Sequence, residues 1–259
     1  MPPRDAPYDR YARHYDAIGQ SAFGLRSVIH LLHLLDDCSF RPGSVLDIAC
    51  GTGAVAIELA RQGLRVGGLD RSPAMLDIAR ADADAAHVAV TWLEADMTSF
   101  AIAESVDLCT CWYDAVNYLP DRSALLGFLQ SAASALRHGG YLAFDINTRK
   151  KLAEHWDDST IVAADDGDRF LVYRSWYDNQ SESSPLLVTG FERTANGSWE
   201  RFDEEHIEYV FAIADIVDAL QQSGFAQIEV LEWGEGGMRE RRLGTESSFR
   251  VLFLAQWTA

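Results

Sequence analysis

A glycine-rich turn between two acidic residues is the part of this sequence best suited to chemistry. The run 45–53, Val-Leu-Asp-Ile-Ala-Cys-Gly-Thr-Gly, indicates a strand that enters a turn and then a helix. Glycines let the backbone approach a ligand closely, and the free N–H groups that start a helix favour a negative or polar group. Asp70 ends the next apolar run, 19 residues past Gly51, where a carboxylate can accept both hydroxyls of an adenosine ribose. The spacing predicts an adenosine-containing cofactor, unless Asp70 only begins the turn before Ser72-Pro73.

Asp47 narrows the choice of cofactor. An acid inside the first strand suits a ligand that carries a cationic amino-acid portion better than it suits a nicotinamide cofactor. The pattern Asp47-x-Ala49-x-Gly51-x-Gly53 resembles the first motif of class I S-adenosylmethionine-dependent methyltransferases. With Ala at the first glycine, it resembles their glycine N-methyltransferase-like, small-molecule branch, and the resemblance covers the whole chain in order. It implies methyl transfer from S-adenosylmethionine to a nitrogen or oxygen of a small molecule. An NAD(P)-dependent oxidoreductase and a non-catalytic S-adenosylmethionine-binding module remain the alternatives.

The resemblance also implies which side chains contact the cofactor. It places these contacts at Tyr11, Tyr15, Arg26, Asp47, Ala49, Gly51, Gly53, Asp70, Arg71, Asp96, Met97 and Trp112. By this resemblance, Asp96 takes the adenine amine while Met97 packs on the ring. Arg26 is suited to a carboxylate, which a guanidinium binds through two hydrogen bonds. Tyr11 and Tyr15, four residues apart, are expected to close over the cofactor, although they equally fit an amphipathic helix that docks by its aromatic face.

The acceptor is expected beyond the fourth and fifth strands, because ligands of open α/β sheets bind at the carboxyl ends of the strands. The resemblance places acceptor contacts at Asp114, Asn117, Tyr118, Asn147 and Arg149. Asp114 is the expected catalytic base, with a helix N-cap as the plainer alternative. Asn147 stands where glycine N-methylating relatives place an Arg that binds the carboxylate of the acceptor. Amino-acid acceptors are therefore disfavoured, although Arg149 could reach such a carboxylate instead. A neutral or amine-bearing acceptor is therefore favoured.

His206 is a second candidate base, on a strand that also carries Glu204 and Glu205. Core packing is the plainer interpretation for a single histidine or aromatic residue of that region. No metal is expected, because the adjacent Asp-Asn pair of catechol O-methyltransferases is missing after the fifth strand. The four cysteines lack the spacing of a zinc site.

Alternating apolar runs and helical patterns must position these residues. We expect a helix over 8–37, strands at 44–49, 65–69, 88–93, 106–112 and 140–146, and helices at 53–62, 73–85 and 121–137. Apolar runs without polar alternation suit strands buried on both faces of a parallel sheet. The α/β alternation therefore predicts a doubly wound sheet. The resemblance implies seven mostly parallel strands in the order 3-2-1-4-5-7-6.

The pattern changes after residue 150. Segments at 159–164, 169–177, 186–194 and 199–211 alternate apolar and polar residues between turn signals, which predicts an antiparallel meander. A helix at 213–223 and strands at 226–233 and 247–257 follow. We therefore expect one methyltransferase domain, with an N-terminal helical lid (1–40), a cofactor-binding core (41–150), an antiparallel β insertion as a further lid (151–211), and a C-terminal helix and strands of the core (212–259).

Charge limits the partners. The chain has 22 Lys and Arg against 39 Asp and Glu, a formal net charge of −17. A field this negative disfavours nucleic acids and anionic membranes, whose attraction depends on basic side chains. The N-terminus lacks the apolar core of a signal peptide, and no apolar run approaches the roughly 18 residues that span a bilayer. We expect a cytoplasmic enzyme with a small-molecule acceptor, compatible with a homodimer.

Overall fold

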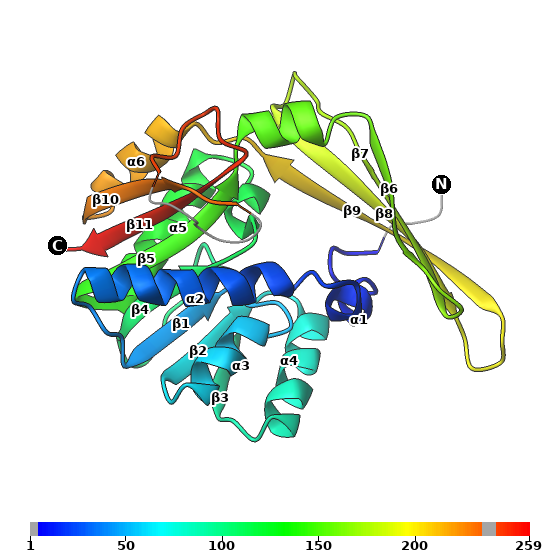
Figure 1. The fold of residues 1–259 in the computed structure, drawn as a ribbon, viewed down its shortest axis with the longest axis horizontal. Coiled ribbons are helices and arrows are strands. Elements are labelled where there is room, and N and C mark those ends of the chain that lie inside the picture. Colours follow the sequence, from blue (N-terminus) through cyan, green and yellow to red (C-terminus); the bar gives the residue numbers. More distant parts are fainter. Residues whose placement is uncertain (1–4, 235–241) are drawn as a thin grey trace.

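One seven-stranded sheet, formed within the described residues, has the order β10-β11-β5-β4-β1-β2-β3 (Figure 1). The computed structural model of the chain describes residues 5–234 and 242–259. The strands are β1 (Ser44–Ile48), β2 (Arg65–Asp70), β3 (Val90–Glu94), β4 (Val106–Cys111), β5 (Leu136–Asn147), β10 (Phe225–Glu232) and β11 (Arg250–Trp257). All neighbours are parallel except β11, which is antiparallel to both β5 and β10. The predicted order is confirmed, since β10 and β11 are the sixth and seventh strands of this sheet along the chain.

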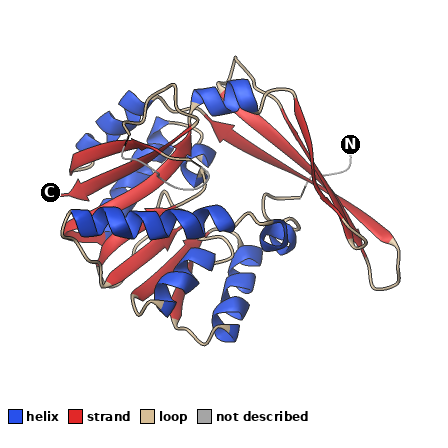
Figure 2. Ribbon diagram, in the orientation of Figure 1, coloured by secondary structure: helices blue, strands red, loops and turns tan. Residues whose placement is uncertain are grey.

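Helices cover both faces of this sheet (Figure 2). They are α2 (Ala22–Asp37), α3 (Ala54–Arg61), α4 (Pro73–Ala85), α5 (Arg122–Ala135) and α6 (Ile213–Gln222). Helices α2 and α3 pack with Val45 and Leu108 on one face, whereas α5 and α6 pack with Ile48 and Cys109 on the other. Strands β1 and β4 are therefore covered on both sides, which explains their continuous apolar sequence.

A four-stranded antiparallel sheet, here called the lid sheet, leaves the main sheet after β5 and returns at α6. Its strands, in the order β6-β7-β8-β9, are β6 (Ser159–Asp165), β7 (Arg169–Ser175), β8 (Ser183–Arg193) and β9 (Trp199–Tyr209). This confirms the predicted β insertion. A π-helical turn, η3 (Lys151–His155), leads into it. Leu171, Val188 and Phe202 of the lid sheet form a small apolar cluster with Tyr11.

The predicted single helix over 8–37 is wrong. The chain instead forms α1 (Ala12–Tyr15), a 3-10 turn η1 (Asp16–Ile18) and then α2. Gly19 separates them with a φ of +83°, a left-handed conformation that ends the helix. The break lets residues 5–21, here called the N-terminal segment, pass between the main sheet and the lid sheet (Figure 1).

Other boundaries also differ from the prediction, among them the start of β8, at Ser183 rather than 186. Helix α5 ends at Ala135 and β5 begins at Leu136, because the pairing of β4 with β5 is irregular and already starts at Leu136. The last strand begins at Arg250 rather than 247, since residues 245–248 form a turn closed by a hydrogen bond from the Ser248 N–H to the Thr245 carbonyl. Residues 1–4 of the expected lid and 235–241 of the C-terminal segment lie outside the described residues.

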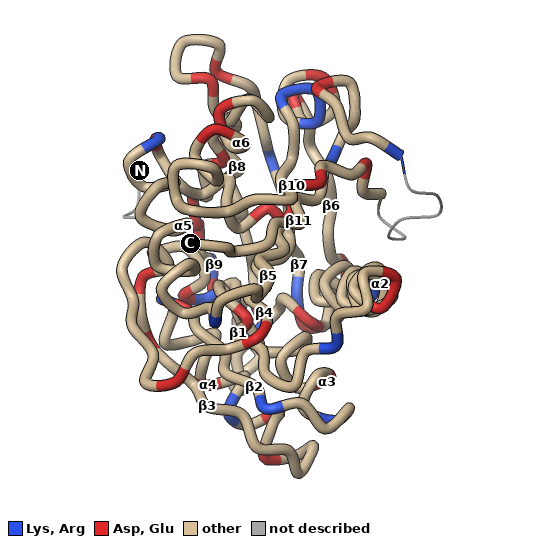
Figure 3. Tube along the Cα trace, turned by 90° about the vertical axis from the view of Figure 1, so that its left-hand side faces the viewer, with Lys and Arg blue, Asp and Glu red and all other residues tan. Residues whose placement is uncertain are grey.

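Acidic positions occur on helices, strands and loops along the whole trace (Figure 3). Among the residues that the structure describes, no helix is both long and apolar enough to cross a membrane.

Candidate active site

The turn after β1 is held in an unusual backbone conformation. Ala49, Gly51 and Gly53 all have positive φ, at 54°, 54° and 76°. A Cβ on Gly53 would lie 2.5 Å from Trp92 Cη2 and 2.9 Å from Ala79 Cβ, so this glycine is needed for space as well as for conformation. The turn therefore exposes backbone without side chains just before α3, and a ligand can approach such backbone closely.

Asp70, at the end of β2, fixes this turn. Its Oδ2 accepts the Gly51 N–H at 2.8 Å and its Oδ1 accepts the Ser72 N–H at 2.8 Å. Burial raises the pKa of Asp70, and the backbone donors partly offset this rise. A carboxylate oxygen has two lone-pair sites, so each oxygen keeps one for a ligand hydroxyl. The geometry suits a ribose diol beside the turn.

Asp47 is buried in β1 beneath the same turn. Its Oδ1 accepts a hydrogen bond from Thr110 Oγ1 at 2.7 Å. Burial raises its pKa to about 7, Thr110 lowers it, and the nearby charge of Asp70 raises it again. Because an adjacent cation favours the ionised form, this carboxylate is suited to receive a positively charged part of the ligand.

Two cavities meet at the turn. One has a volume of about 400 Å³ and the other of about 50 Å³. They share the lining residues Tyr15, Ala49, Gly51, Trp112 and Tyr113. The larger is in the size range of small-molecule sites.

Most predicted cofactor residues line these cavities. The larger cavity is lined by Tyr15, Ala49, Gly51, Asp70, Arg71, Asp96, Met97, Trp112 and Tyr118, and Asp47 lines the smaller one. Asp96 is held at the rim by Thr98, whose N–H and hydroxyl both donate to Asp96 Oδ1, at 2.7 and 2.6 Å. These bonds lower the pKa of Asp96, so it is ionised at neutral pH.

Other predicted residues lie away from the cavity lining, namely Tyr11, Arg26, Gly53, Asp114, Asn117, Asn147, Arg149 and His206. Arg26 is exposed on α2. Arg149 pairs with Glu182 and packs over the ring of Tyr177, on the outside of the molecule. The Tyr11 hydroxyl lies 2.5 Å from the Tyr173 hydroxyl, so this ring packs against the lid sheet rather than over the cofactor site.

Asp114 is engaged by a buried ion cluster. Its Oδ2 accepts from Arg250 at 3.0 Å and from Asn147 Nδ2 at 2.5 Å. Asp145 also pairs with Arg250, and it accepts the N–H groups of Tyr113 at 2.7 Å and Asp114 at 3.2 Å. Tyr113 and Asp114 both have positive φ, so Asp145 and Arg250 hold a strained turn after β4. The Asp114 side chain makes no N-cap hydrogen bond.

Glu208 of β9 completes this cluster. Asn147 Nδ2 donates to Glu208 Oε2 at 2.9 Å. Burial and the charge of Asp114 raise the pKa of Glu208 well above its usual range. The cluster gathers the carboxyl groups of Asp114, Asp145 and Glu208 near one guanidinium, and none of these residues is in the cavity lining.

Tyrosines make up much of the lining of the larger cavity. Tyr8, Tyr15, Tyr113 and Tyr118 line it together with Trp112, and this part of the lining is here called the tyrosine-lined end. Burial raises the pKa of each of the four phenols, which therefore stay neutral at neutral pH. Tyr8 and Tyr113 were not predicted from the sequence. Tyr113 adjoins the predicted residues Trp112 and Asp114, whereas Tyr8 lies three residues before Tyr11. Both have a positive φ of 61°, a turn conformation that the sequence alone does not indicate.

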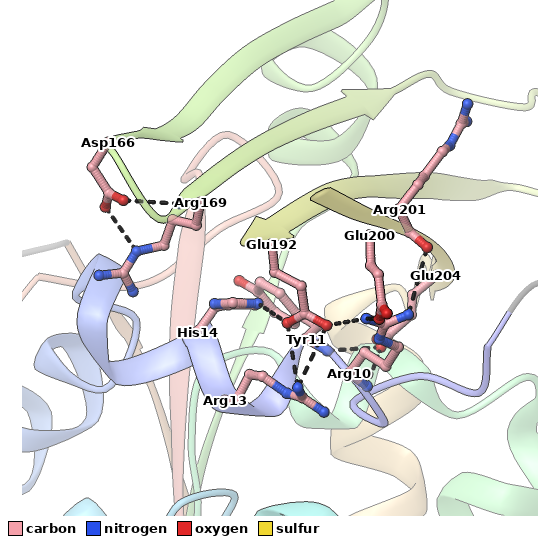
Figure 4. A network of polar contacts seen from close by, with 10 residues as sticks. All are labelled: Arg10, Tyr11, Arg13, His14, Asp166, Arg169, Glu192, Glu200, Arg201 and Glu204. Atoms are coloured by element: carbon pink, nitrogen blue, oxygen red, sulfur yellow. Dashed lines mark hydrogen bonds and ion pairs between the residues drawn. The ribbon is translucent and has the colours of Figure 1, made fainter. Parts of the chain in front are cut away.

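The N-terminal segment is clamped to the lid sheet by two carboxylates (Figure 4). Glu204 accepts the backbone N–H groups of Tyr8, Arg10 and Tyr11 at 2.7, 2.7 and 2.8 Å. Glu192 pairs with Arg10, with Arg13 at 3.3 Å and with His14 at 3.3 Å. The segment that carries Tyr8 and Tyr15 is thus fixed over the cavity.

Comparison with known proteins agrees with this site. Residues 45–140 match the family model described as "Methyltransferase domain". The chain is 30% identical over 212 residues to a Geobacillus sp. (strain WCH70) protein named "Putative methyltransferase", a match that covers 82% of this chain and 83% of the relative. The chain therefore belongs to the class I S-adenosylmethionine-dependent methyltransferases, as its sequence motif predicts.

Solved structures share the whole fold. An S-adenosylmethionine-dependent methyltransferase from Clostridium acetobutylicum has a TM-score of 0.82 at 21% identity, covering 97% of this chain and 99% of its own. CalS10, an amino pentose methyltransferase from Micromonospora echinaspora solved with S-adenosylmethionine bound, has a TM-score of 0.71 at 20% identity, covering 99% and 100%. S-adenosylmethionine is the cofactor, which sets aside the NAD(P)-dependent oxidoreductase alternative.

The residues around the turn fit this cofactor. The bare glycine backbone and Asp70 suit the ribose. The larger cavity also offers an apolar lining for adenine, from Leu69, Met75 and Met97. Asp47 lines the smaller cavity, where its negative charge favours a cationic group of the ligand.

Proposed function

We propose that this enzyme methylates a nitrogen or oxygen atom of a small molecule, and that the acceptor is neutral or amine-bearing rather than a carboxylate or a phosphate ester. The tyrosine-lined end of the larger cavity is the observation that carries this proposal. The charged residues in the lining are Asp70, Arg71 and Asp96, which follow β2 and β3 on the cofactor side. The tyrosine-lined end offers neutral hydroxyls and aromatic faces, which attract cations and tolerate neutral groups.

The nearest buried cation does not offer an anion site. Arg250 already pairs with Asp114 and Asp145, and both acids are buried. Asn147, at the position where a carboxylate-binding Arg is expected in glycine N-methylating relatives, is itself buried and bonded to Asp114 and Glu208. Arg71 is the only cation among the described residues that line the larger cavity. An anionic acceptor that does not reach Arg71 would therefore be buried there without a positive partner from the lining, at a high desolvation cost.

The fold neighbours are consistent with such an acceptor. CalS10, which shares the fold over essentially its full length, is an amino pentose methyltransferase by its own description. An amino sugar combines an amine with neutral hydroxyls, and both kinds of group match the tyrosine-lined end.

When bound, the cofactor supplies an electrophilic methyl group on a positively charged sulfur. The protein's own contribution is alignment: the turn at 49–53 and Asp70 fix one reactant, and the tyrosine-lined end holds the other. Such positioning is worth roughly 7–11 kcal/mol of the barrier. Trp112, Tyr15 and Tyr113 lie where the two cavities meet, so their rings exclude water from this junction.

Asp114 serves this arrangement indirectly in our proposal. Its carboxylate is bonded to Arg250 and Asn147, so we assign it to holding the turn that presents Tyr113 and leads to Tyr118. Asn117 acts beside it: its Nδ2 donates to the Asn147 and Tyr209 carbonyls, both at 3.0 Å, which ties the turn η2 (Ala115–Tyr118) to β5 and β9.

Incubation with methyl-labelled S-adenosylmethionine and a cell extract tests the proposal, with the small-molecule, protein and nucleic-acid fractions counted separately. We expect label in the small-molecule fraction, on an amine or a hydroxyl. The Asp70→Ala variant controls for background labelling. Label confined to protein or nucleic acid, or found on a carboxylate oxygen, would overturn the proposal. No labelled product at all would support the non-catalytic binding module instead.

A further inference from the structure

Four side chains form a line of polar contacts from the tyrosine-lined end of the cavity into the lid sheet. The Tyr8 hydroxyl lies 2.8 Å from the Tyr118 hydroxyl, and both rings line the cavity. The Tyr118 hydroxyl lies 3.1 Å from His206 Nδ1. On the other side of the imidazole, Nε2 lies 3.4 Å from Glu204 Oε2. The line thus joins the cavity to a histidine and a carboxylate.

Burial isolates this line from bulk water. His206 is 2% exposed and Glu204 is fully buried. The Tyr8 ring packs edge-on against the imidazole, with centroids 4.7 Å apart, and the Tyr11 ring packs at 5.8 Å. A histidine so enclosed exchanges protons through its hydrogen-bond partners, of which Tyr118 is the one that reaches the cavity.

Glu204 sets which imidazole nitrogen carries the proton. Burial raises the pKa of Glu204, but the contact with His206 and the N–H groups of Tyr11 and Arg10 outweigh this and keep it ionised. An ionised carboxylate beside Nε2 favours a hydrogen on Nε2, which leaves the Nδ1 lone pair for the Tyr118 hydroxyl. Tyr8 then donates a hydrogen bond to Tyr118, and the Tyr8 oxygen is left to accept one from an acceptor molecule in the cavity. At 3.4 Å from Glu204, Nε2 has no hydrogen-bond partner among the described residues, so the carboxylate acts on it through charge.

We propose that Tyr8, Tyr118 and His206 form a proton relay that accepts the proton released by the acceptor, with Glu204 as the positioning residue. This inference rests on the proposed small-molecule function. As the acceptor's lone pair bonds the methyl carbon, the carbon–sulfur bond breaks and its electron pair stays on sulfur. The acceptor's proton moves to the Tyr8 oxygen, the Tyr8 proton to Tyr118, and the Tyr118 proton to His206 Nδ1. The imidazolium that results lies beside the negative charge of Glu204.

Glu204 also links the relay to the lid. The same carboxylate that faces His206 holds the N-terminal segment through three backbone N–H groups. Tyr8, the first member of the relay, belongs to that segment. The relay is therefore complete only when the segment covers the cavity, and opening of the segment exposes His206 so that its proton can leave to water.

Activity as a function of pH gives the first test. The titratable groups that face His206 are Glu204 and Glu208 on β9, Tyr8 and Tyr11 of the N-terminal segment, and Tyr118 of η2.

His206→Asn keeps an acceptor oxygen near the position of Nδ1 but cannot take a proton. We expect kcat to fall about 100-fold in His206→Asn and in Tyr118→Phe, the typical scale of general-base loss. We also expect the acidic limb of the kcat profile to disappear in His206→Asn. The acceptor for this assay is found first, by incubating a defined panel of amino sugars and phenols with labelled S-adenosylmethionine and choosing the compound that gains label.

Glu192→Gln is the matched control for lid loosening, because Glu192 holds the N-terminal segment without contacting His206. We expect this variant to bind S-adenosylmethionine more weakly while keeping the wild-type shape of the pH profile. A wild-type kcat and profile in His206→Asn, or the same profile change in Glu192→Gln, would overturn the relay while the methylated product still supports the proposed function.

A second test needs no acceptor. Long-range proton–nitrogen NMR spectra of the full-length protein with S-adenosylhomocysteine report the tautomer of His206, assigned by its loss in His206→Asn. We expect hydrogen on Nε2, and a shift of the Nδ1 resonance in Tyr118→Phe. Hydrogen on Nδ1 would overturn the relay, because that nitrogen could not then accept a proton. If the panel gains no label, the proposed function fails and this spectrum still decides the relay.

Discussion

Asp47 is the residue whose ionisation we expect to respond most directly to the cofactor. Burial disfavours the ionised form of this carboxyl group, and its pKa is raised to about 7 in the absence of a ligand. Thr110 supplies one hydrogen bond, which offsets only part of the cost. A cationic ligand group would restore the charge, and binding is therefore coupled to deprotonation.

This coupling predicts a pH-dependent affinity for S-adenosylmethionine. Below pH 7 the cation must displace a proton from Asp47, so affinity should rise with pH up to about 7 and then level off. The slope is at most tenfold per pH unit, as for one coupled proton. Calorimetry across this range measures it. Asp47→Asn should show a flat profile in the same range, and an equally steep profile in that variant would show that another group is responsible.

Asp70→Ala should weaken S-adenosylmethionine binding by about 2 kcal/mol or more, about thirtyfold in Kd, because a charge-assisted bond to the ribose and the support of the Gly51 N–H are both lost. Calorimetry gives the Kd directly. Asp77→Ala is the matched control, since Asp77 is exposed on α4 and pairs only with the surface residue Arg80. An unchanged Kd in Asp70→Ala would remove Asp70 from the site.

At the scale of elements, the turn between β1 and α3 depends on two separate properties of glycine. Gly53 needs a positive φ, and it also needs the space of its missing Cβ. Gly63, after α3, has a similar φ of +87° but nothing within 4 Å of an added Cβ. The two positions therefore separate conformational strain from crowding.

Gly63→Ala should lower the free energy of unfolding by about 1 kcal/mol, the cost of strain alone. Gly53→Ala should lower it by about 2–4 kcal/mol, since crowding against Trp92 and Ala79 adds to the strain. Urea unfolding measures both, and calorimetry should show that only Gly53→Ala also weakens cofactor binding. Equal destabilisation of the two variants would mean that the site around Gly53 relaxes freely.

Most elements could be predicted because their signals are local. The continuous apolar runs of β1, β2 and β4 and the alternation of the lid sheet identify buried and half-exposed strands from the sequence alone. The helix predicted over 8–37 was wrong because helical periodicity continues across Gly19, whose left-handed φ depends on where the N-terminal segment must go.

The candidate site was predictable where chemistry follows a strand end, as at Asp47, Gly51 and Asp70. It was not predictable where distant segments meet. Arg250, 136 residues after Asp114, gives no sequence signal for the ion pair that it makes with that residue. Arg26 has suitable chemistry but lies outside the cavity lining, because spacing along the chain does not fix the direction of a helical side chain.

On the scale of the whole molecule, the active site lies between two sheets joined by the N-terminal segment. The main sheet supplies the cofactor turn, while the lid sheet supplies Glu204 and His206, which contact the Tyr8 and Tyr118 side of the cavity. The chain has a formal net charge of −17, and its acidic positions occur along the whole trace (Figure 3). Such a field raises the local concentration of cations and repels anions.

A matched acceptor series tests the central claim most directly: kcat/KM for an amino sugar, for its N-acetyl derivative and for the analogue that carries a carboxylate in place of the amine, each with labelled S-adenosylmethionine. We expect the amine to be methylated best and the carboxylate to be worse by about tenfold or more, because an uncompensated buried charge costs about 1.4 kcal/mol or above. A carboxylate that is methylated as well as the amine, or better, would contradict a neutral or amine-bearing acceptor.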